Sequence, residues 1–101
     1  MKKQLLLFLV LLFPVQIWAD AVKINGIYYN LITKGKVAEV TSNPEKYTGI
    51  VDIPSKVSYN GDEYDVTIIG EKAFYNCSGL TSVTIPKSVA IIGSAAFSGC
   101  I

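Results

Sequence analysis

The sequence of 101 residues contains no histidine and no arginine, only two cysteines and a single methionine. Without histidine, the Ser-His and Cys-His pairs that activate nucleophiles cannot form, and histidine-bearing zinc sites are excluded. Two cysteines cannot complete a tetrahedral zinc site unless carboxylates join them. A glycine-rich phosphate-binding loop is also absent from the sequence. The composition therefore predicts a non-catalytic protein without a metal or another cofactor.

Charge is nearly balanced along the chain, which carries nine lysines and eight acidic residues. When Lys2, Lys3 and Asp20 are left out, seven of each sign remain, and the lysines do not cluster. Nucleic-acid-binding domains need a basic patch or stripe. We therefore expect no nucleic acid among the partners.

One acidic group, formed by Asp62, Glu63 and Asp65, lies beside a predicted hairpin tip. Paired carboxylates can hydrolyse glycosides, but they need a cleft and a raised pKa on one partner, and a hairpin tip offers neither. The spacing also differs from that of an EF-hand loop. We interpret the group as a solvated turn, with weak calcium binding as the alternative.

The amino-terminal segment, residues 1–21, has the pattern of a secretory signal peptide. Lys2 and Lys3 form a basic start, residues 5–13 are an unbroken apolar run, and Ala19-Asp20-Ala21 is a small-residue cleavage site. The apolar run is too short to span a bilayer as a stable anchor. We expect cleavage after Ala19 or Ala21, no membrane span afterwards, and a secreted or cell-surface product of about 80 residues, enough for one small domain.

The mature part is organised around one motif that occurs twice. VTIIGEKAFYNC at residues 66–77 recurs as VAIIGSAAFSGC at residues 89–100, so Val, Ile, Ile, Gly, Ala, Phe and Cys each return 23 positions later. A period of roughly 20–29 residues with fixed apolar positions is typical of a leucine-rich-repeat solenoid. One such unit cannot bury its apolar face alone, so the copies must stack.

Each repeat is predicted to contain two short strands and two corners. Residues 80–85 alternate with period two and end at Pro86, which cannot donate a ladder hydrogen bond. Residues 89–92 are expected to form a second strand, and Ala96, Phe97 and Cys100 have the spacing of a compact turn or of one helical turn. Gly70 and Gly93 are expected where the backbone needs positive φ or close approach.

A degenerate copy lies upstream, where Ile53-Pro54-Ser55-Lys56-Val57 matches residues 85–89 at a spacing of 32. The nine extra residues, 58–66, contain Asn60-Gly61 between β-prone runs, which predicts an inserted hairpin. Asn25-Gly26 predicts a second hairpin nearer the amino terminus, and residues 37–41 a further strand.

The pattern I-P-x-S-V-x-x-I-G-x-x-A-F-x-x-C-x-x-L-x-x-V-x-I-P resembles the BspA-type leucine-rich repeat of bacterial surface proteins. The resemblance covers residues 49–101, and residues 26–47 look like the amino-terminal cap of such proteins. It implies a mainly β solenoid with a β-hairpin cap over residues 22–48 and repeats over 49–101. It also implies a role in adhesion, with host matrix proteins or other cells as partners.

Five tyrosines precede the regular repeats, at positions 28, 29, 47, 59 and 64. We interpret most of them as cap packing, because a terminal coil exposes apolar core unless something covers it. An aromatic platform for a sugar is the alternative.

The two cysteines, Cys77 and Cys100, occupy equivalent places in successive repeats. Adjacent coils lie about 4.8 Å apart, within disulfide range, but the two Cβ vectors would run parallel. A ladder of small buried residues is the favoured interpretation, and a disulfide stays open. Asn76-Cys77-Ser78 matches a glycosylation motif, but the bacterial origin that the resemblance implies makes glycosylation there a weak prediction.

The predicted binding surface is the outer face of the stacked strands. Val83 and Ile85 are expected to point inward, so Ser82 and Thr84 point outward, and Ile50 and Asp52 occupy the equivalent places in the degenerate copy. Repetition extends this face into a surface suited to macromolecular partners. The simpler interpretation is that Ser82 and Thr84 are polar residues that suit an exposed strand and have no binding role.

The sequence thus predicts an exported, non-catalytic adhesion or binding module for an extracellular protein or glycan. The alternatives are the repeat region of a larger exported carbohydrate-active enzyme, or a gene fragment without independent function. The sequence stops at Ile101 inside a repeat, so we expect an incomplete protein whose open last coil favours self-association.

Overall fold

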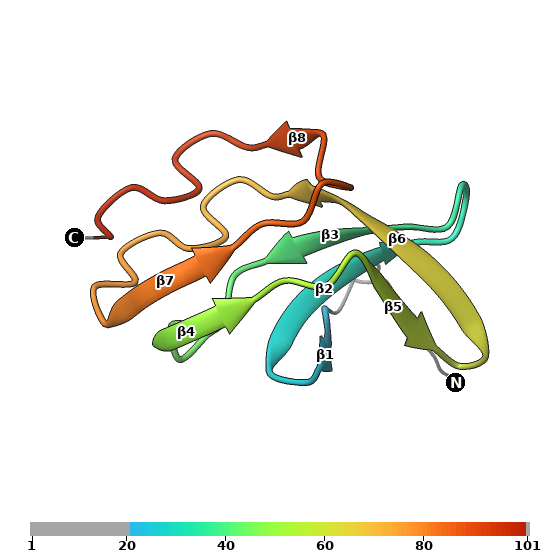
Figure 1. Ribbon diagram of the computed structural model, residues 1–101, viewed down its shortest axis with the longest axis horizontal. Coiled ribbons are helices and arrows are strands. Elements are labelled where there is room, and N and C mark those ends of the chain that lie inside the picture. Colours follow the sequence, from blue (N-terminus) through green and yellow to red (C-terminus); the bar gives the residue numbers. More distant parts are fainter. Residues whose placement is uncertain (1–20, 101) are drawn as a thin grey trace, which may run out of the picture.

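The computed structural model describes residues 21–100, and this part of the chain consists of strands and turns without a helix (Figure 1). The predicted signal peptide at residues 1–21 lies almost wholly outside these described residues. The mainly β prediction is confirmed. The strands are β1 (Val22–Ile24), β2 (Ile27–Ile32), β3 (Val37–Thr41), β4 (Gly49–Asp52), β5 (Lys56–Tyr59), β6 (Asp62–Ile69), β7 (Leu80–Thr84) and β8 (Ile91–Ile92).

Two sheets form the two long sides of a flattened coil. The larger sheet has the order β1-β2-β3-β6-β5, and β8 pairs with the last residues of β6, past the stretch that pairs with β5. The smaller sheet contains β4 and β7. The pairings β3–β6, β6–β8 and β4–β7 are parallel, as stacked coils require, whereas the hairpin pairings are antiparallel. Strand β3 therefore continues the same stack as β6 and β8.

The register of these parallel pairs confirms the predicted repeat. Ile68 lies opposite Ile91 and Ile69 opposite Ile92, so each residue pairs with its counterpart in the next copy of the motif. Val51 lies opposite Val83. These two residues are 32 positions apart in the sequence, the larger spacing that the insertion produces. The inserted residues form the β5–β6 hairpin.

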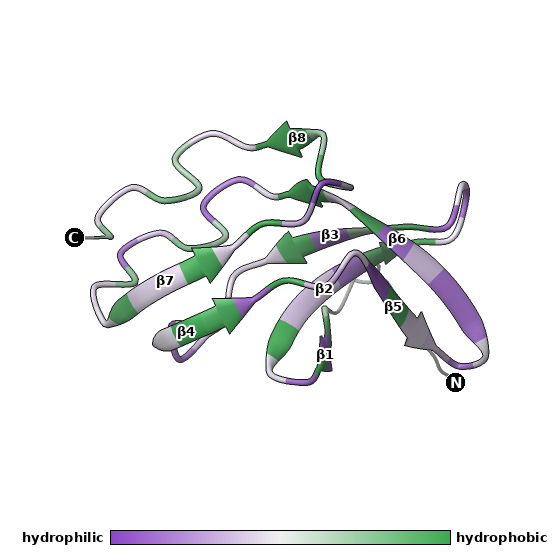
Figure 2. Ribbon diagram, viewed as in Figure 1, coloured by the Kyte–Doolittle hydropathy of each residue, from purple (hydrophilic) through white to green (hydrophobic). Residues whose placement is uncertain are grey.

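That hairpin turns at Asn60-Gly61, as predicted. Tyr59 pairs with Asp62, and Asn60 and Gly61 have φ angles of 50° and 84°. Two consecutive positive φ values match the twist of a two-residue hairpin. Figure 2 shows that β6 is hydrophilic at this turn and hydrophobic at its other end, where it joins the stack between β3 and β8.

The corner after β6 was expected to form a compact turn or one helical turn, and the structure shows a run of tight turns there. The N–H groups of Ala73, Tyr75 and Cys77 donate to carbonyls three residues back. The intervening N–H groups of Lys72, Phe74 and Asn76 donate across to the next coil, at the carbonyls of Ser94, Ala96 and Ser98. A helix would direct every N–H along its own axis, so the inter-coil bonds decide the shape of the corner.

Gly93 allows the coils to approach closely at this corner. A Cβ atom at Gly93 would lie 2.6 Å from the Glu71 backbone nitrogen and 2.8 Å from the Gly70 carbonyl carbon. Its φ is not positive, in contrast to Lys72 and Ala95. Of the two expectations for Gly70 and Gly93, close approach is therefore the correct one.

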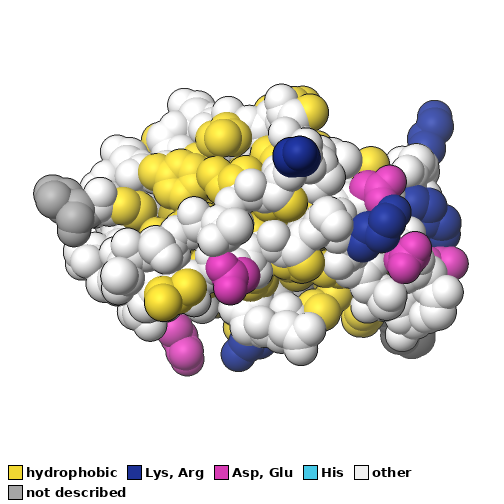
Figure 3. Space-filling view, viewed as in Figure 1, with side chains coloured by type: hydrophobic (Ala, Val, Ile, Leu, Met, Phe, Trp, Pro, Cys, Tyr) yellow, Lys and Arg dark blue, Asp and Glu magenta, His cyan; other side chains and the backbone are white. Residues whose placement is uncertain are grey.

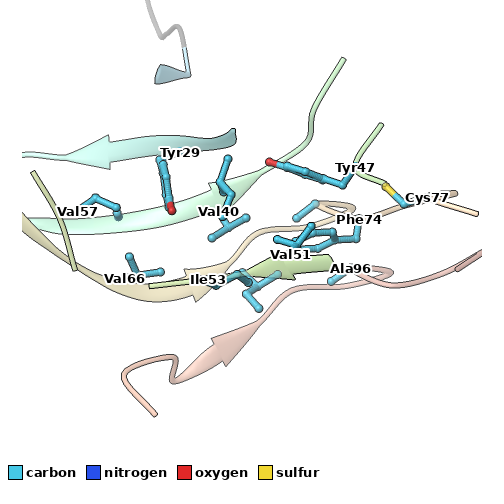
Figure 4. Packing of buried hydrophobic residues seen from close by; sticks show 14 of the residues in the cluster. Tyr29, Val40, Tyr47, Val51, Ile53, Val57, Val66, Phe74, Cys77 and Ala96 are labelled. Atoms are coloured by element: carbon cyan, nitrogen blue, oxygen red, sulfur yellow. The ribbon is translucent and has the colours of Figure 1, made fainter. Parts of the chain in front are cut away.

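The core is a layer of aliphatic and aromatic side chains between the two sheets (Figure 4). Phe74 is fully buried, and Tyr47 packs on one side of it with ring centroids 4.7 Å apart. The Tyr47 hydroxyl donates to the Thr41 carbonyl at 2.7 Å and accepts the Tyr28 N–H at 3.0 Å. Tyr29, Tyr47 and Tyr64 are buried, which agrees with cap packing for most of the tyrosines.

Candidate functional site

The outer face of the β4–β7 sheet brings together the four residues that the sequence singled out. Ile50 lies opposite Ser82 and Asp52 opposite Thr84. All four side chains are exposed, and Ile50 keeps 70% of its surface accessible. Val51 and Val83 alternate with them on the inner face. The result is a small two-strand platform with one large apolar side chain.

Ile85 departs from the expected pattern. It was predicted to point inward, but it remains 39% exposed. Strand β7 ends at Thr84, and its side away from β4 pairs with no strand in the described part of the chain. Ile85 joins Leu80, Val83 and Phe97 in lining a hollow of about 380 Å³. Figure 3 shows hydrophobic side chains gathered in this region between β7 and β8.

Two further hollows were not anticipated from the sequence. Each has a volume of about 410 Å³, and Asn25, Ile27 and Asp52 line both of them. The first continues along Lys46, Tyr47, Thr48 and Ile50, whereas the second continues along Pro54, Lys56 and Val57. Together they follow the chain along β4 and past the tip of the β1–β2 hairpin. The hairpin motif at Asn25-Gly26 was visible in the sequence, but nothing there indicated that its tip would lie beside β4.

The acidic group on the β5–β6 hairpin is engaged by lysines. Lys36 Nζ lies 3.3 Å from an Asp62 carboxylate oxygen, and Lys56 Nζ lies 2.7 Å from Asp65. The hydrogen bond to Asp65, and then its charge, raise the pKa of Lys56. Figure 3 shows these opposite charges mixed at the hairpin end of the molecule. Residues 21–100 hold no group of three potential metal ligands, and the ion pairs favour the solvated-turn interpretation.

Both cysteines are free thiols in the structure. Cys77 is buried, and Cys100 is partly buried with its Sγ 2.8 Å from the Phe74 carbonyl oxygen. The structure therefore favours the unbridged interpretation, although only Cys77 of the two is buried.

Comparison with known families decides the classification. A model of the family described as "BspA type Leucine rich repeat region (6 copies)" matches residues 51–101, half of the chain. The chain belongs to this BspA-type family. The match coincides with the repeats described above, and the parallel pairing of successive coils is its structural counterpart. Leucine-rich repeats of this type are generally non-catalytic and serve protein binding.

Solved structures extend the similarity beyond the repeats. A leucine-rich repeat protein from Bacteroides capillosus is 38% identical over 81% of this chain, with a TM-score of 0.68. One from Bacteroides ovatus is 33% identical over 75%, with a TM-score of 0.64. A leucine rich cell surface protein from Faecalibacterium prausnitzii is 32% identical over 78%, with a TM-score of 0.65. No curated protein matches the chain.

This BspA-type chain spans only part of those proteins. It covers 60% of the Bacteroides capillosus chain, 20% of the Bacteroides ovatus chain and 21% of the Faecalibacterium prausnitzii chain. Among residues 21–100, no helix is long and apolar enough to cross a membrane.

Proposed function

We propose that this BspA-type chain is an exported, non-catalytic binding module. In this proposal the outer face of β4 and β7 contacts an extracellular protein or glycan, and the module acts in adhesion at or near the cell surface. The family supports protein binding in general terms. The adhesive role and the choice of partner are the parts that need experiment.

The observation that carries the proposal is the exposed Ile50 on the paired strands β4 and β7. This large apolar side chain keeps 70% of its surface accessible, and a partner that covers it removes apolar area from water, which stabilises the complex. Asp52, Ser82 and Thr84 surround it with polar groups that can fix orientation. An apolar centre with a polar rim is the usual anatomy of a protein-binding surface.

Support for export comes from the amino-terminal sequence and from one similar structure. The basic start, the apolar run and Ala19-Asp20-Ala21 are the three parts of a signal peptide. The Faecalibacterium prausnitzii protein is described as a cell surface protein. Mass spectrometry of the secreted product should give an amino terminus at Asp20 or Val22. Recovery of a soluble protein that retains Met1 would contradict export.

The binding face can be tested with a matched pair of isoleucines. Ile50 and Ile32 are both exposed, but Ile32 lies at the end of β2, outside the β4–β7 sheet. The purified protein would be screened against immobilised extracellular-matrix proteins and bacterial or host glycans. Ile50→Lys should weaken any binding by about tenfold or more, the usual effect of losing a central contact. Ile32→Lys should change it by less than about twofold. Equal losses from both variants would exclude the β4–β7 face.

A further inference from the structure

Within residues 21–100 both edges of the two-stranded sheet are unpaired, and the two hollows of about 410 Å³ border the edge that belongs to β4. The only strand partner of β4 in residues 21–100 is β7. The N–H groups of Gly49 and Ile53 donate toward β7, to the carbonyls of Gly79 and Thr84 at 3.0 and 3.1 Å. Successive residues of a strand direct their backbone groups to opposite sides. The N–H and C=O groups of Ile50 and Asp52 therefore point away from β7.

The open edge of β4 faces hollow space instead of a covering element. Both hollows of about 410 Å³ are lined by Asp52 together with Asn25 and Ile27 of the β1–β2 hairpin. The first reaches back along Thr48 and Ile50, and the second continues to Pro54 and Val57. The β1–β2 hairpin thus stands across from the β4 edge and leaves a groove between them. An additional strand would lie about 4.8 Å from β4.

The charged side chains that line the groove differ in whether they have partners. The two lysines that line its ends are engaged elsewhere, because Lys56 pairs with Asp65 at 2.7 Å and Lys46 Nζ donates to the Tyr75 carbonyl at 3.2 Å. The Asp52 carboxylate, shared by both hollows, takes part in no ion pair within residues 21–100. A charged residue on an edge strand discourages pairing with a like-charged or purely apolar edge. It favours a strand that carries a cation.

We propose that the free edge of β4 binds an extended polypeptide segment of a partner protein, which adds as a third strand next to β4. Backbone hydrogen bonds to Ile50 and Asp52 supply the pairing, as in other strand-addition complexes. An apolar side chain of the segment packs beside Ile50, and a lysine or arginine pairs with Asp52. The occupant is a polypeptide because alternating N–H and C=O groups at strand spacing complement another backbone and not a glycan.

This inference goes beyond the proposed function because it uses the backbone edge of β4, whereas the proposed function uses the outer face of the β4–β7 sheet. Ile50 and Asp52 contribute side chains to both surfaces, so the test compares a backbone change with a side-chain change at Asp52 and adds an outer-face change at Ser82. Asp52→Pro removes the outward N–H from the edge and leaves the bonds toward β7 in place, so the fold should tolerate it. Asp52→Asn keeps that N–H and removes only the charge. Thr84→Pro is the matched disruptive control, because Thr84 lies opposite Asp52 in the parallel ladder and proline removes the N–H that Thr84 directs toward β4.

The probe is a displayed library of linear peptides of about eight residues, enough to cover a strand of this length. The purified protein selects binders, which are then resynthesised and measured by titration. We expect peptides with apolar residues at alternate positions and at least one lysine or arginine. Asp52→Pro should weaken their binding by about tenfold or more, Asp52→Asn by a smaller factor, and Ser82→Lys on the outer face by less than about twofold.

Amide hydrogen exchange gives a measurement that needs no variant. In the free protein, the amides of Ile50 and Asp52 should exchange much faster than that of Ile53, and the bound peptide should slow both. Slow exchange at Ile50 and Asp52 in the free protein would overturn the proposal, because the edge would already be paired. So would a library without enriched peptides, or peptides that Ser82→Lys releases and Asp52→Pro does not. In this last case the outer face is the binding surface, and the proposed function stands without the edge.

Discussion

The rings of Phe74 and Phe97 stack nearly parallel, with centroids 5.1 Å apart and planes inclined by 6°. Tyr47 continues this stack on the other side of Phe74, with its ring tilted by 37°. One aromatic side chain from each of three successive corners therefore forms a continuous column. Because the Tyr47 hydroxyl also bonds to the backbone of Thr41 and Tyr28, the column links the amino-terminal strands to the repeats.

Removal of the central ring should strongly destabilise the protein. Phe74 is fully buried, so Phe74→Ala loses its transfer free energy and leaves a cavity, at a cost of about 3–5 kcal/mol. A domain of this size has roughly 5–10 kcal/mol in total, so the variant should be marginal. Urea unfolding monitored by circular dichroism measures the difference. Phe97→Ala should cost less, because Phe97 is only partly buried. A loss below about 1 kcal/mol for Phe74→Ala would show that the column is not part of the core.

The close approach at Gly93 can be tested with a second glycine. A methyl group at Gly93 would meet backbone atoms at 2.6–2.9 Å, and these can move only if the coils separate. Gly93→Ala should cost about 1–3 kcal/mol, as for overpacked cores. At Gly79 the nearest atom is the flexible Thr48 side chain at 3.2 Å, so Gly79→Ala should be close to neutral. Equal thermal stability of the two variants would contradict this account of the corner.

Stability should fall at alkaline pH because two buried tyrosines resist ionisation. Burial, and to a smaller extent neighbouring Tyr47, raises the pKa of Tyr29 to about 12, and burial likewise raises that of Tyr47 to about 12. The unfolded chain releases these protons near the ordinary pKa of 10.0. The contribution is therefore complete below about pH 10 and is lost as pH rises toward about 12.

Urea unfolding at a series of pH values checks this alkaline effect. Tyr29→Phe removes one titrating group and should flatten the decline in unfolding free energy between about pH 10 and 12. The unchanged protein, measured over the same pH range, is the control. An unchanged slope in Tyr29→Phe would mean that Tyr29 reaches solvent.

The thiols should differ in reactivity. Cys100 is partly exposed and should react with a thiol reagent in the folded protein, whereas Cys77 should react only when the protein unfolds. Mild reduction should leave the melting temperature unchanged, because no disulfide joins the two thiols. A native mass lower by two hydrogens, together with a melting temperature that falls on reduction, would support the disulfide instead.

The exposed strand β8 should promote self-association of the isolated fragment 22–101. Ile91 and Ile92 keep 56% and 53% of their surfaces accessible, and β6 is the only partner of β8 in the described chain. A second copy can cover this apolar edge. Changing both isoleucines to lysine should shift light scattering toward the monomer, whereas Ile32→Lys should not. A protein that is monomeric at high concentration before any change would exclude this contact.

Much of the repeat architecture follows from local pattern. The return of the Val66–Cys77 motif as Val89–Cys100, the alternation of Val83 with its polar neighbours, and the Asn60-Gly61 turn each depend on neighbours in sequence. Such features can be predicted from the sequence, because strand side chains alternate with a period of two and two-residue turns have a fixed length. The parallel registers confirm the offsets of 23 and 32 that the sequence predicted.

Other features were decided only when the chain folded. Lys72 and Ala95 take positive φ values that neither residue type favours, at two corners joined by bonds from alternate N–H groups of the first to alternate carbonyls of the second. The tip of the β1–β2 hairpin comes to lie beside Asp52, which is distant from Asn25 in the sequence, and the two hollows exist only through that approach. A repeated sequence predicts that its copies stack, since every copy carries apolar side chains at the same positions. A groove between unlike segments depends on the twist and packing of the whole sheet, so no local period in the sequence records it.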